Sequence, residues 1–200
     1  MDNYEYIIAS LPVIEQDNRN ARDLDVPGIH AMILEQLSGR DKVSFELLLS
    51  GFDPEKLDVG FYRSALADHN DFIKGYFTYD FNVRNTKVEY LNSELGRPAG
   101  TDIMLLDEDA DPEEFEGKAE VMAVLSQQDI LGRERGLDDL MWKKCEELTL
   151  MHVFDMDVIL GFTARLQIID RWLKLDPETG RELFRKLVNE IRNSKSEYGN

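Results

Sequence analysis

Hydrophobic positions recur at helical spacing through most of the chain and predict an all-α protein. The longest stripe steps by three and four residues and comprises Leu66, His69, Ile73, Phe77, Asp80, Arg84, Val88, Leu91 and Leu95. It predicts a helix of about 30 residues, about 45 Å long at 1.5 Å per residue, that ends before Gly96 and Pro98. We therefore expect an elongated helical bundle.

Shorter patterns predict the remaining helices, and each begins or ends at a capping signal. Residues 155–174 are apolar nearly all round, which predicts a central, buried helix. Residues 3–11 fit a helix or a strand, and the spacing favours a helix that ends at Pro12. The other predicted helices cover residues 29–38 after Pro27-Gly28, residues 42–51 capped by Asp41, residues 112–126 after Asp111-Pro112, residues 129–151, and residues 181–193.

The chain shows no Pro/Gly/Ser-rich linker between these segments. Residues 1–200 therefore form either a single all-helical domain or two lobes, 1–100 and 101–200. In the second case the acidic loop at 107–116 would join the lobes.

The net charge of −17 argues against nucleic acid as a partner, because phosphate binding needs clustered Lys and Arg. The same charge disfavours direct docking on an anionic lipid surface. No segment approaches the ~20 apolar residues that span a bilayer, and the N-terminal apolar run is too short for a signal peptide. Cys145 is the only cysteine, so no disulfide forms within the chain. We expect a cytoplasmic protein without membrane insertion.

The most acidic segment is a candidate partner contact and comprises Asp107, Glu108, Asp109, Asp111, Glu113 and Glu114. Three of its aspartates match the first positions of a calcium loop, which also needs Gly at position six and Glu at position twelve. Pro112 and Lys118 occupy those two positions. We predict a solvated loop that faces a basic protein surface, with no metal.

His152, Asp155 and Asp157 suggest a second metal site, but their spacing on a helix does not bring them to one ion. We predict that Asp155 caps the following helix. We interpret His69 as a core or boundary residue, and Cys145 as a half-buried helical thiol. The chain carries no phosphate-binding glycine loop and no nucleophile elbow, so we predict no cofactor and no catalytic residue.

Charged residues on the buried stripe predict a polar layer between packed helices. Asp80 and Arg84 lie four residues apart with the acid first, which is the favourable order for a helical ion pair. Arg165 holds a comparable place between Phe162 and Ile169 on the later helix. We expect the layer to include Asp80, Arg84 and Arg165, with Asp80–Arg84 as one of its links, because unpaired buried charges are strongly destabilising.

The segment "YDFNV" (Tyr79–Val83) is echoed by "FDMDV" (Phe154–Val158), which suggests two pseudo-repeated helical units. The opening "NYEYIIASLP" and the stretch from Phe154 to Val188 resemble an uncharacterised bacterial family encoded among V/A-type ATPase subunit genes. A fainter similarity extends to the subunit named C in these ATPases (named d in the eukaryotic enzyme), through Asp80, Asn82, Arg84 and Asn85.

The resemblance implies a non-enzymatic ATPase component, such as a socket that couples the central rotor stalk to the membrane ring. Its partners would be stalk and ring subunits at the cytoplasmic face of the membrane. An assembly or regulatory factor that binds the complex transiently is the alternative. An enzyme with carboxylate chemistry is a third hypothesis, and it requires several acids to converge in one pocket.

Overall fold

Helix α8 (Met156–Lys174) forms the centre of the fold in the computed structural model, which describes residues 3–16, 24–106 and 115–174. Eleven of its 19 residues are buried. It packs against α1, α2, α3, α5 and α7, so helices from both halves of the chain cover it. The prediction of a central, buried helix at 155–174 is confirmed.

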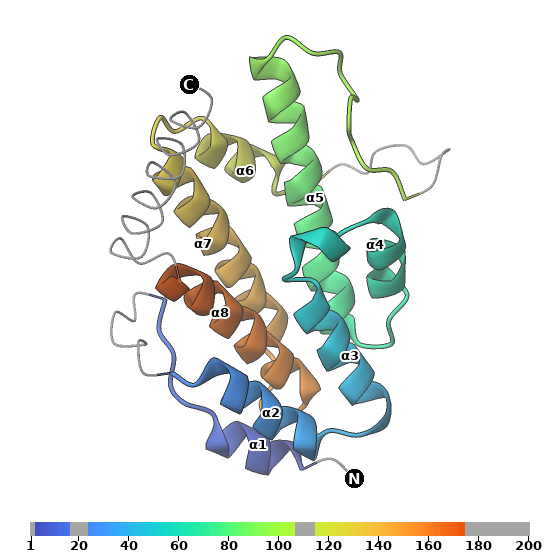
Figure 1. The fold of residues 1–200 in the computed structure, drawn as a ribbon, viewed down its shortest axis with the longest axis vertical. Helices are drawn as coiled ribbons and strands as arrows, with labels where there is room; N and C mark the ends of the chain where they lie inside the picture. Colours follow the sequence, from blue (N-terminus) through green and yellow to red (C-terminus); the bar gives the residue numbers. More distant parts are fainter. Residues whose placement is uncertain (1–2, 17–23, 107–114, 175–200) are drawn as a thin grey trace, which may run out of the picture.

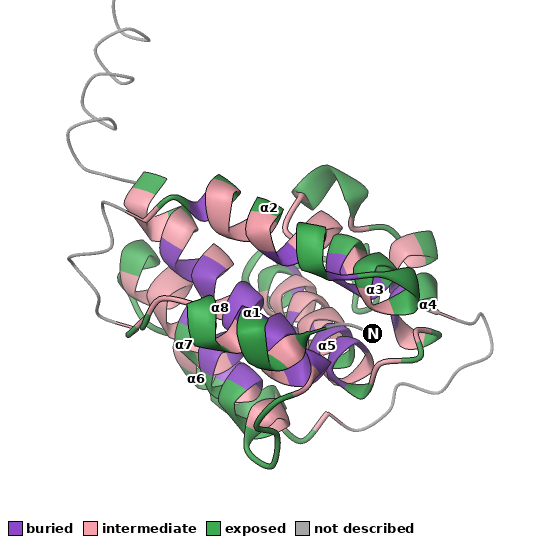
Figure 2. Ribbon diagram, turned by 90° about the horizontal axis from the view of Figure 1, so that it is seen from below, coloured by how far each residue is buried: buried purple, intermediate pink, exposed green. Residues whose placement is uncertain are grey.

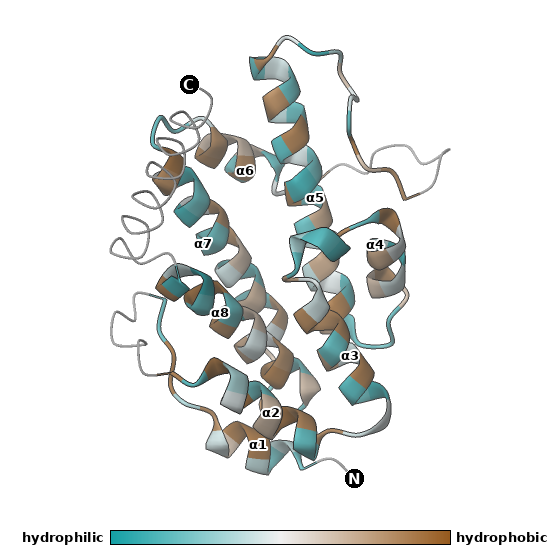
Figure 3. Cartoon of the chain, in the orientation of Figure 1, coloured by the Kyte–Doolittle hydropathy of each residue, from teal (hydrophilic) through white to brown (hydrophobic). Residues whose placement is uncertain are grey.

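Helix α5 (Asp71–Glu94) is the second axis of the bundle and packs against α4, α6, α7 and α8. It lies beside the pair formed by α7 and α8 (Figure 1). Hydrophobic positions recur along both α5 and α8 (Figure 3). The buried hydrophobic side chains of α5 are Phe72, Ile73, Tyr76, Phe77 and Val83.

The remaining helices surround these two. They are α1 (Tyr4–Ser10), α2 (Val26–Gln36), α3 (Gly39–Ser50), the 3-10 turn η2 (Pro54–Lys56), α4 (Val59–Leu66), α6 (Lys118–Leu125) and α7 (Ile130–Thr149). Over the ranges that the structure describes, all regular elements are helical, which confirms the all-α prediction. Residues 4–10 are helical as favoured, and Asn3 caps them by accepting a hydrogen bond from the Tyr6 amide at 3.2 Å.

The prediction of one helix through residues 66–95 is wrong, because the chain turns between α4 and α5. Leu66 ends α4, and His69 lies in the turn. The side chain of Asp68 accepts a hydrogen bond from the Asn70 amide at 2.8 Å, and Asn70 caps α5 through the Ile73 amide at 3.0 Å. Local acceptors of this kind favour turns and caps over helix interiors. Helix α5 is therefore about 36 Å long.

Three predicted helix starts are also corrected. Helix α2 begins at Val26 after the cap Asp25 and not at residue 29, so Pro27-Gly28 lies in its first turn. Helix α3 begins at Gly39 after Ser38, so Asp41 lies in its first turn and does not cap it. Helix α6 begins at Lys118 and not at residue 112, because Phe115–Gly117 form a turn before it. The pair Asp111-Pro112 and the predicted helix 181–193 lie outside the described residues.

The two copies of the five-residue echo occupy different places. Asp80 lies well inside α5, whereas its counterpart Asp155 precedes α8. Most buried hydrophobic side chains from α1 to α8 belong to one cluster, and Val26, Phe162 and Leu166 form a second one between α2 and α8. The outward sides of the helices are exposed (Figure 2). The division into lobes at the acidic loop stays a prediction.

Gly161 allows α8 to approach α7 closely. A Cβ atom at this position would lie 2.5 Å from the Thr149 methyl group and 3.3 Å from the Phe72 ring. Threonine has a stiff, β-branched side chain, so it yields little. A hydrogen on Gly161 is therefore all that fits between these helices.

We predict that Gly161→Ala lowers the free energy of unfolding by about 1–3 kcal/mol, because an added methyl group overpacks the contact. The control is Gly60→Ala, at an exposed site in α4 where the new Cβ would approach only the exposed Asp58 carboxylate, at 3.2 Å. Urea unfolding of both variants measures the difference. Equal values for the two would contradict close packing at Gly161.

Candidate functional site

Asp80 accepts a hydrogen bond from a buried tyrosine on α4. The Tyr62 hydroxyl donates to Asp80 Oδ2 at 2.6 Å, and Tyr62 is 0% exposed. Burial raises the pKa of the Asp80 carboxyl, and the Tyr62 hydrogen bond and the Arg84 charge partly offset that rise. Burial and the nearby Asp80 charge raise the pKa of Tyr62. The aspartate on the predicted buried stripe is therefore satisfied by a neutral donor.

The two predicted arginines lie in different surroundings. Arg84 acts on Asp80 and Tyr62 through its charge, without a hydrogen bond to the carboxylate. Arg165 donates from Nε to the Gly161 carbonyl at 3.2 Å, and its guanidinium lies 5.4 Å from the centre of the Trp142 ring. The polar layer that would join Asp80, Arg84 and Arg165 stays a prediction.

Asp80 also lines a cleft of about 300 Å³ between α5, α7 and α8. Asp138 lines the same cleft and accepts hydrogen bonds from the Arg171 guanidinium and, at 2.5 Å, from Trp172 Nε1. Burial raises the pKa of Asp138, and Arg171 opposes this. Asp170 pairs with Lys174 at 2.6 Å.

Two carboxyl groups with raised pKa values in one cleft are the pattern of an acid–base site. In this cleft, however, each carboxylate is held by a donor of the protein itself. Throughout the described part of the chain, no buried side-chain nitrogen or oxygen lacks a hydrogen-bond partner. Asp138 thereby joins α7 to α8, and Asp80 joins α5 to α4.

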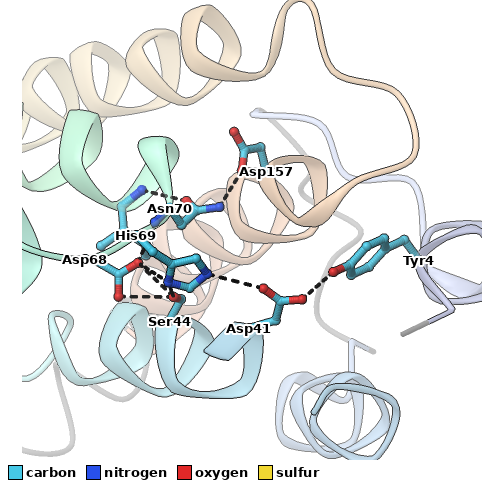
Figure 4. Close-up of polar contacts among 8 residues, drawn as sticks. Tyr4, Asp41, Ser44, Asp68, His69, Asn70 and Asp157 are labelled. Carbon is cyan, nitrogen blue, oxygen red and sulfur yellow. Dashed lines mark hydrogen bonds and ion pairs between the residues drawn. The ribbon is translucent and has the colours of Figure 1, made fainter. Parts of the chain in front are cut away.

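A polar network joins α1, α3, the α4–α5 turn and α8 (Figure 4). The Tyr4 hydroxyl donates to Asp41, whose other oxygen lies 3.5 Å from His69 Nε2. His69 Nδ1 lies 3.2 Å from Asp68. Asn70 Nδ2 donates to Asp157 at 2.6 Å and so ties the start of α5 to the first turn of α8.

Ser44, His69 and Asp41 have the residue types of a hydrolase triad, but their geometry excludes that chemistry. The Ser44 hydroxyl donates to Asp68 at 2.8 Å, whereas His69 Nδ1 is 3.5 Å away. Ser44 is 0% exposed, so no substrate could reach its oxygen. A nucleophilic serine must pass its proton to the base and face the substrate. This cluster is a helix-to-helix contact.

His152 lies between the two acids that the sequence places near it. Its Nδ1 lies 2.7 Å from Asp155, and its Nε2 lies 3.5 Å from Asp157. Asp155 also caps α8 by accepting a hydrogen bond from the Val158 amide at 3.3 Å, as predicted. Within residues 3–16, 24–106 and 115–174, no three His, Cys, Asp or Glu side chains are placed to hold a metal ion.

Cys145 is fully buried on α7, deeper than the half-buried thiol that the sequence predicts. Burial raises its pKa to about 12, so the thiol stays protonated at neutral pH. A thiol in that state is a poor nucleophile.

The most distinctive surface feature is the loop between α7 and α8. Twelve large hydrophobic side chains are exposed among the described residues, and four of them lie on the five residues Leu150–Phe154. Leu150 is 77% exposed, Met151 87%, Val153 64% and Phe154 58%. A cluster of exposed apolar side chains is typical of a protein-binding surface. We refer to Leu150–Phe154 as the apolar loop.

The sequence did not reveal the apolar loop, since we predicted a helix through residue 151. The segment "LMHVFD" itself carries the signal, because four large apolar residues flank a histidine just before a helix cap. The predicted acidic contact (Asp107, Glu108, Asp109, Asp111, Glu113 and Glu114) lies outside the described residues.

Comparison with known protein families gives a match over part of the chain. A family described as "Protein of unknown function (DUF2764)" matches residues 107–195, which include α6, α7, the apolar loop and α8. This similarity agrees with the expected resemblance to an uncharacterised family. No curated protein and no solved structure matches the chain. In the described ranges no helix combines the length and the hydropathy that crossing a membrane requires.

We predict that Tyr62→Phe lowers the free energy of unfolding by about 1–3 kcal/mol, because it leaves the partly buried Asp80 carboxylate without its donor. Tyr6→Phe is the matched control, since Tyr6 is 55% exposed. Urea unfolding at neutral pH compares the two. If Tyr62→Phe were as stable as Tyr6→Phe, Asp80 would not depend on this hydrogen bond.

We predict that two histidines titrate on opposite sides of the ordinary pKa of 6.5. The hydrogen bond to Asp155 raises the pKa of His152, whereas burial lowers that of His30 despite the nearby Asp170. Protonated His152 therefore stabilises the fold below pH 6.5, and this contribution is lost as pH rises through its folded-state pKa. For His30 the sign is reversed, and stability falls as pH drops below 6.5.

An NMR titration of the imidazole protons measures both values. His152→Asn and His30→Asn variants assign the signals. Coincident titration of the two rings near the ordinary value would contradict the contacts of both residues.

Proposed function

We propose that this chain is a non-enzymatic, protein-binding component of a V/A-type ATPase. It would contact central-stalk and membrane-ring subunits at the cytoplasmic face of the membrane, as a socket that seats the stalk on the ring. The observation that carries the binding role is the apolar loop, with four large hydrophobic side chains 58–87% exposed. Burying one such side chain against a partner contributes about 1.5–3 kcal/mol.

The reactive groups of the chain support a role without chemistry of its own. Ser44 and Cys145 are fully buried, and the carboxylates of the α5–α7–α8 cleft each accept hydrogen bonds from the protein. Their contacts hold helices together. A rigid bundle with an exposed apolar loop is suited to binding another protein.

The assignment to a V/A-type ATPase is supported by the resemblance of "NYEYIIASLP" and of residues 154–188 to the family encoded beside its subunit genes. The net charge of −17 is suited to contact with basic protein surfaces. A transient assembly or regulatory factor of the same complex is the alternative proposal.

We predict that the tagged chain, purified from its native cell in mild detergent, recovers stalk and ring subunits near one-to-one. Quantitative mass spectrometry measures the ratio, and an unrelated acidic protein with the same tag controls for binding through charge alone. Recovery far below one-to-one would favour the transient factor. Absence of all ATPase subunits would contradict both proposals.

A further inference from the structure

The apolar loop is held in a defined conformation by its own backbone. The Leu150 amide donates to the Glu147 carbonyl at 3.3 Å, and the His152 amide donates to the Thr149 carbonyl at 3.0 Å. The His152 side chain contacts Asp155, which also caps α8. A loop that is ordered before binding loses less conformational entropy when a partner covers it.

The base of the loop is fixed to the body of the bundle. His152 Nε2 lies 3.5 Å from Asp157, and Asp157 accepts the hydrogen bond from Asn70. Figure 4 shows Asn70 and Asp157 facing each other, beside the His69 contacts with α3. These contacts therefore anchor the base of the apolar loop to the helical bundle.

Acidic groups surround this base. Glu147, Asp155 and Asp71 have side chains that are 66%, 44% and 87% exposed. Asp71 is close enough to raise the pKa of Asp157 by its charge. The two nearby lysines each pair with one of these acids, Lys144 with Glu147 at 3.1 Å and Lys74 with Asp71 at 2.5 Å. Asp155 likewise pairs with His152 at 2.7 Å. With Asp157 counted among the acids, four carboxylates stand against two lysines and one histidine, so negative charge exceeds positive charge around the loop.

We infer that the apolar loop inserts into an apolar groove on another protein, and that the rim of this groove carries Lys and Arg side chains. The inference rests on the proposed function for the identity of that protein, and on the structure for its surface chemistry. Apolar anchors at the centre and complementary charges at the rim are the usual arrangement of a specific interface.

A protein groove fits these observations better than a second copy or a lipid surface. A second copy has the same net charge of −17, so its acidic groups would repel those at the loop. An anionic membrane would be repelled for the same reason. A basic partner surface removes this conflict.

The test places a photo-crosslinking residue on the loop in the full-length chain, in its native cell. Phe154→p-benzoylphenylalanine is compared with Leu131→p-benzoylphenylalanine, because Leu131 is a similarly exposed side chain at the other end of α7. Mass spectrometry identifies the crosslinked peptides. We expect position 154, and not position 131, to crosslink to an apolar peptide of the partner protein. Lys and Arg side chains should surround that peptide on the partner's surface.

The outcomes separate this inference from the proposed function. A crosslink to such a surface on an ATPase subunit supports both, and one on an unrelated protein supports the inference and contradicts the proposed function. A crosslink to a second copy, equal yields from the two positions, or no crosslink would overturn the inference. Copurification of ATPase subunits tests the proposed function in a separate experiment, whichever surface the loop crosslinks to.

Reversing the charge of one acidic residue beside the apolar loop tests the basic rim of the partner's groove. Glu147→Lys should lower the crosslinking yield from position 154 roughly tenfold, because like charges then face each other. Glu55→Lys, at an exposed site on η2, should leave the yield unchanged. Equal yields for the two variants would overturn the basic rim.

A final control uses neutral phosphatidylcholine vesicles. If the wild-type chain floated with them and Leu150→Ser/Met151→Ser did not, the loop would be a membrane anchor and the inference would be wrong. Equal thermal midpoints for these variants and the wild type establish that all of them are folded.

Discussion

Helix α8 carries apolar side chains around most of its circumference, so it is stable only where other helices cover it on several sides. Helices α1, α2 and α3 cover it from the N-terminal half of the chain, and α5 and α7 cover it from the middle. This requirement brings segments distant in sequence together. It also places Gly161 against Thr149, where the backbones approach closely.

Each buried or partly buried carboxylate of the helix contacts has its own hydrogen-bond donors in this acidic protein. Asp80 has the Tyr62 hydroxyl, Asp138 has Arg171 and Trp172, and Asp157 has the Asn70 amide. Tyr62, Trp172 and Asn70 are neutral groups, so most of these hydrogen bonds come from uncharged donors. Since each carboxylate takes its donors from an element other than its own, these hydrogen bonds also join neighbouring elements.

The positions of most helices could be predicted because apolar spacing and capping residues are local signals. The break at residues 67–70 could not, because the stripe from Leu66 to Ile73 keeps helical spacing across the turn. Tyr62 was missed as the partner of Asp80 because it comes next to Asp80 only when that turn folds α4 back against α5. The exposure of Leu150–Phe154 depends on where α7 ends. From the sequence alone, a run of large apolar residues is equally consistent with a buried core segment.

The hydrogen bond between Asn70 and Asp157 has a mechanical consequence. It joins the first turn of α8 to the start of α5, a few residues from the apolar loop. Movement of the loop would therefore act on the start of α5 through the contacts of His152, Asp157 and Asn70.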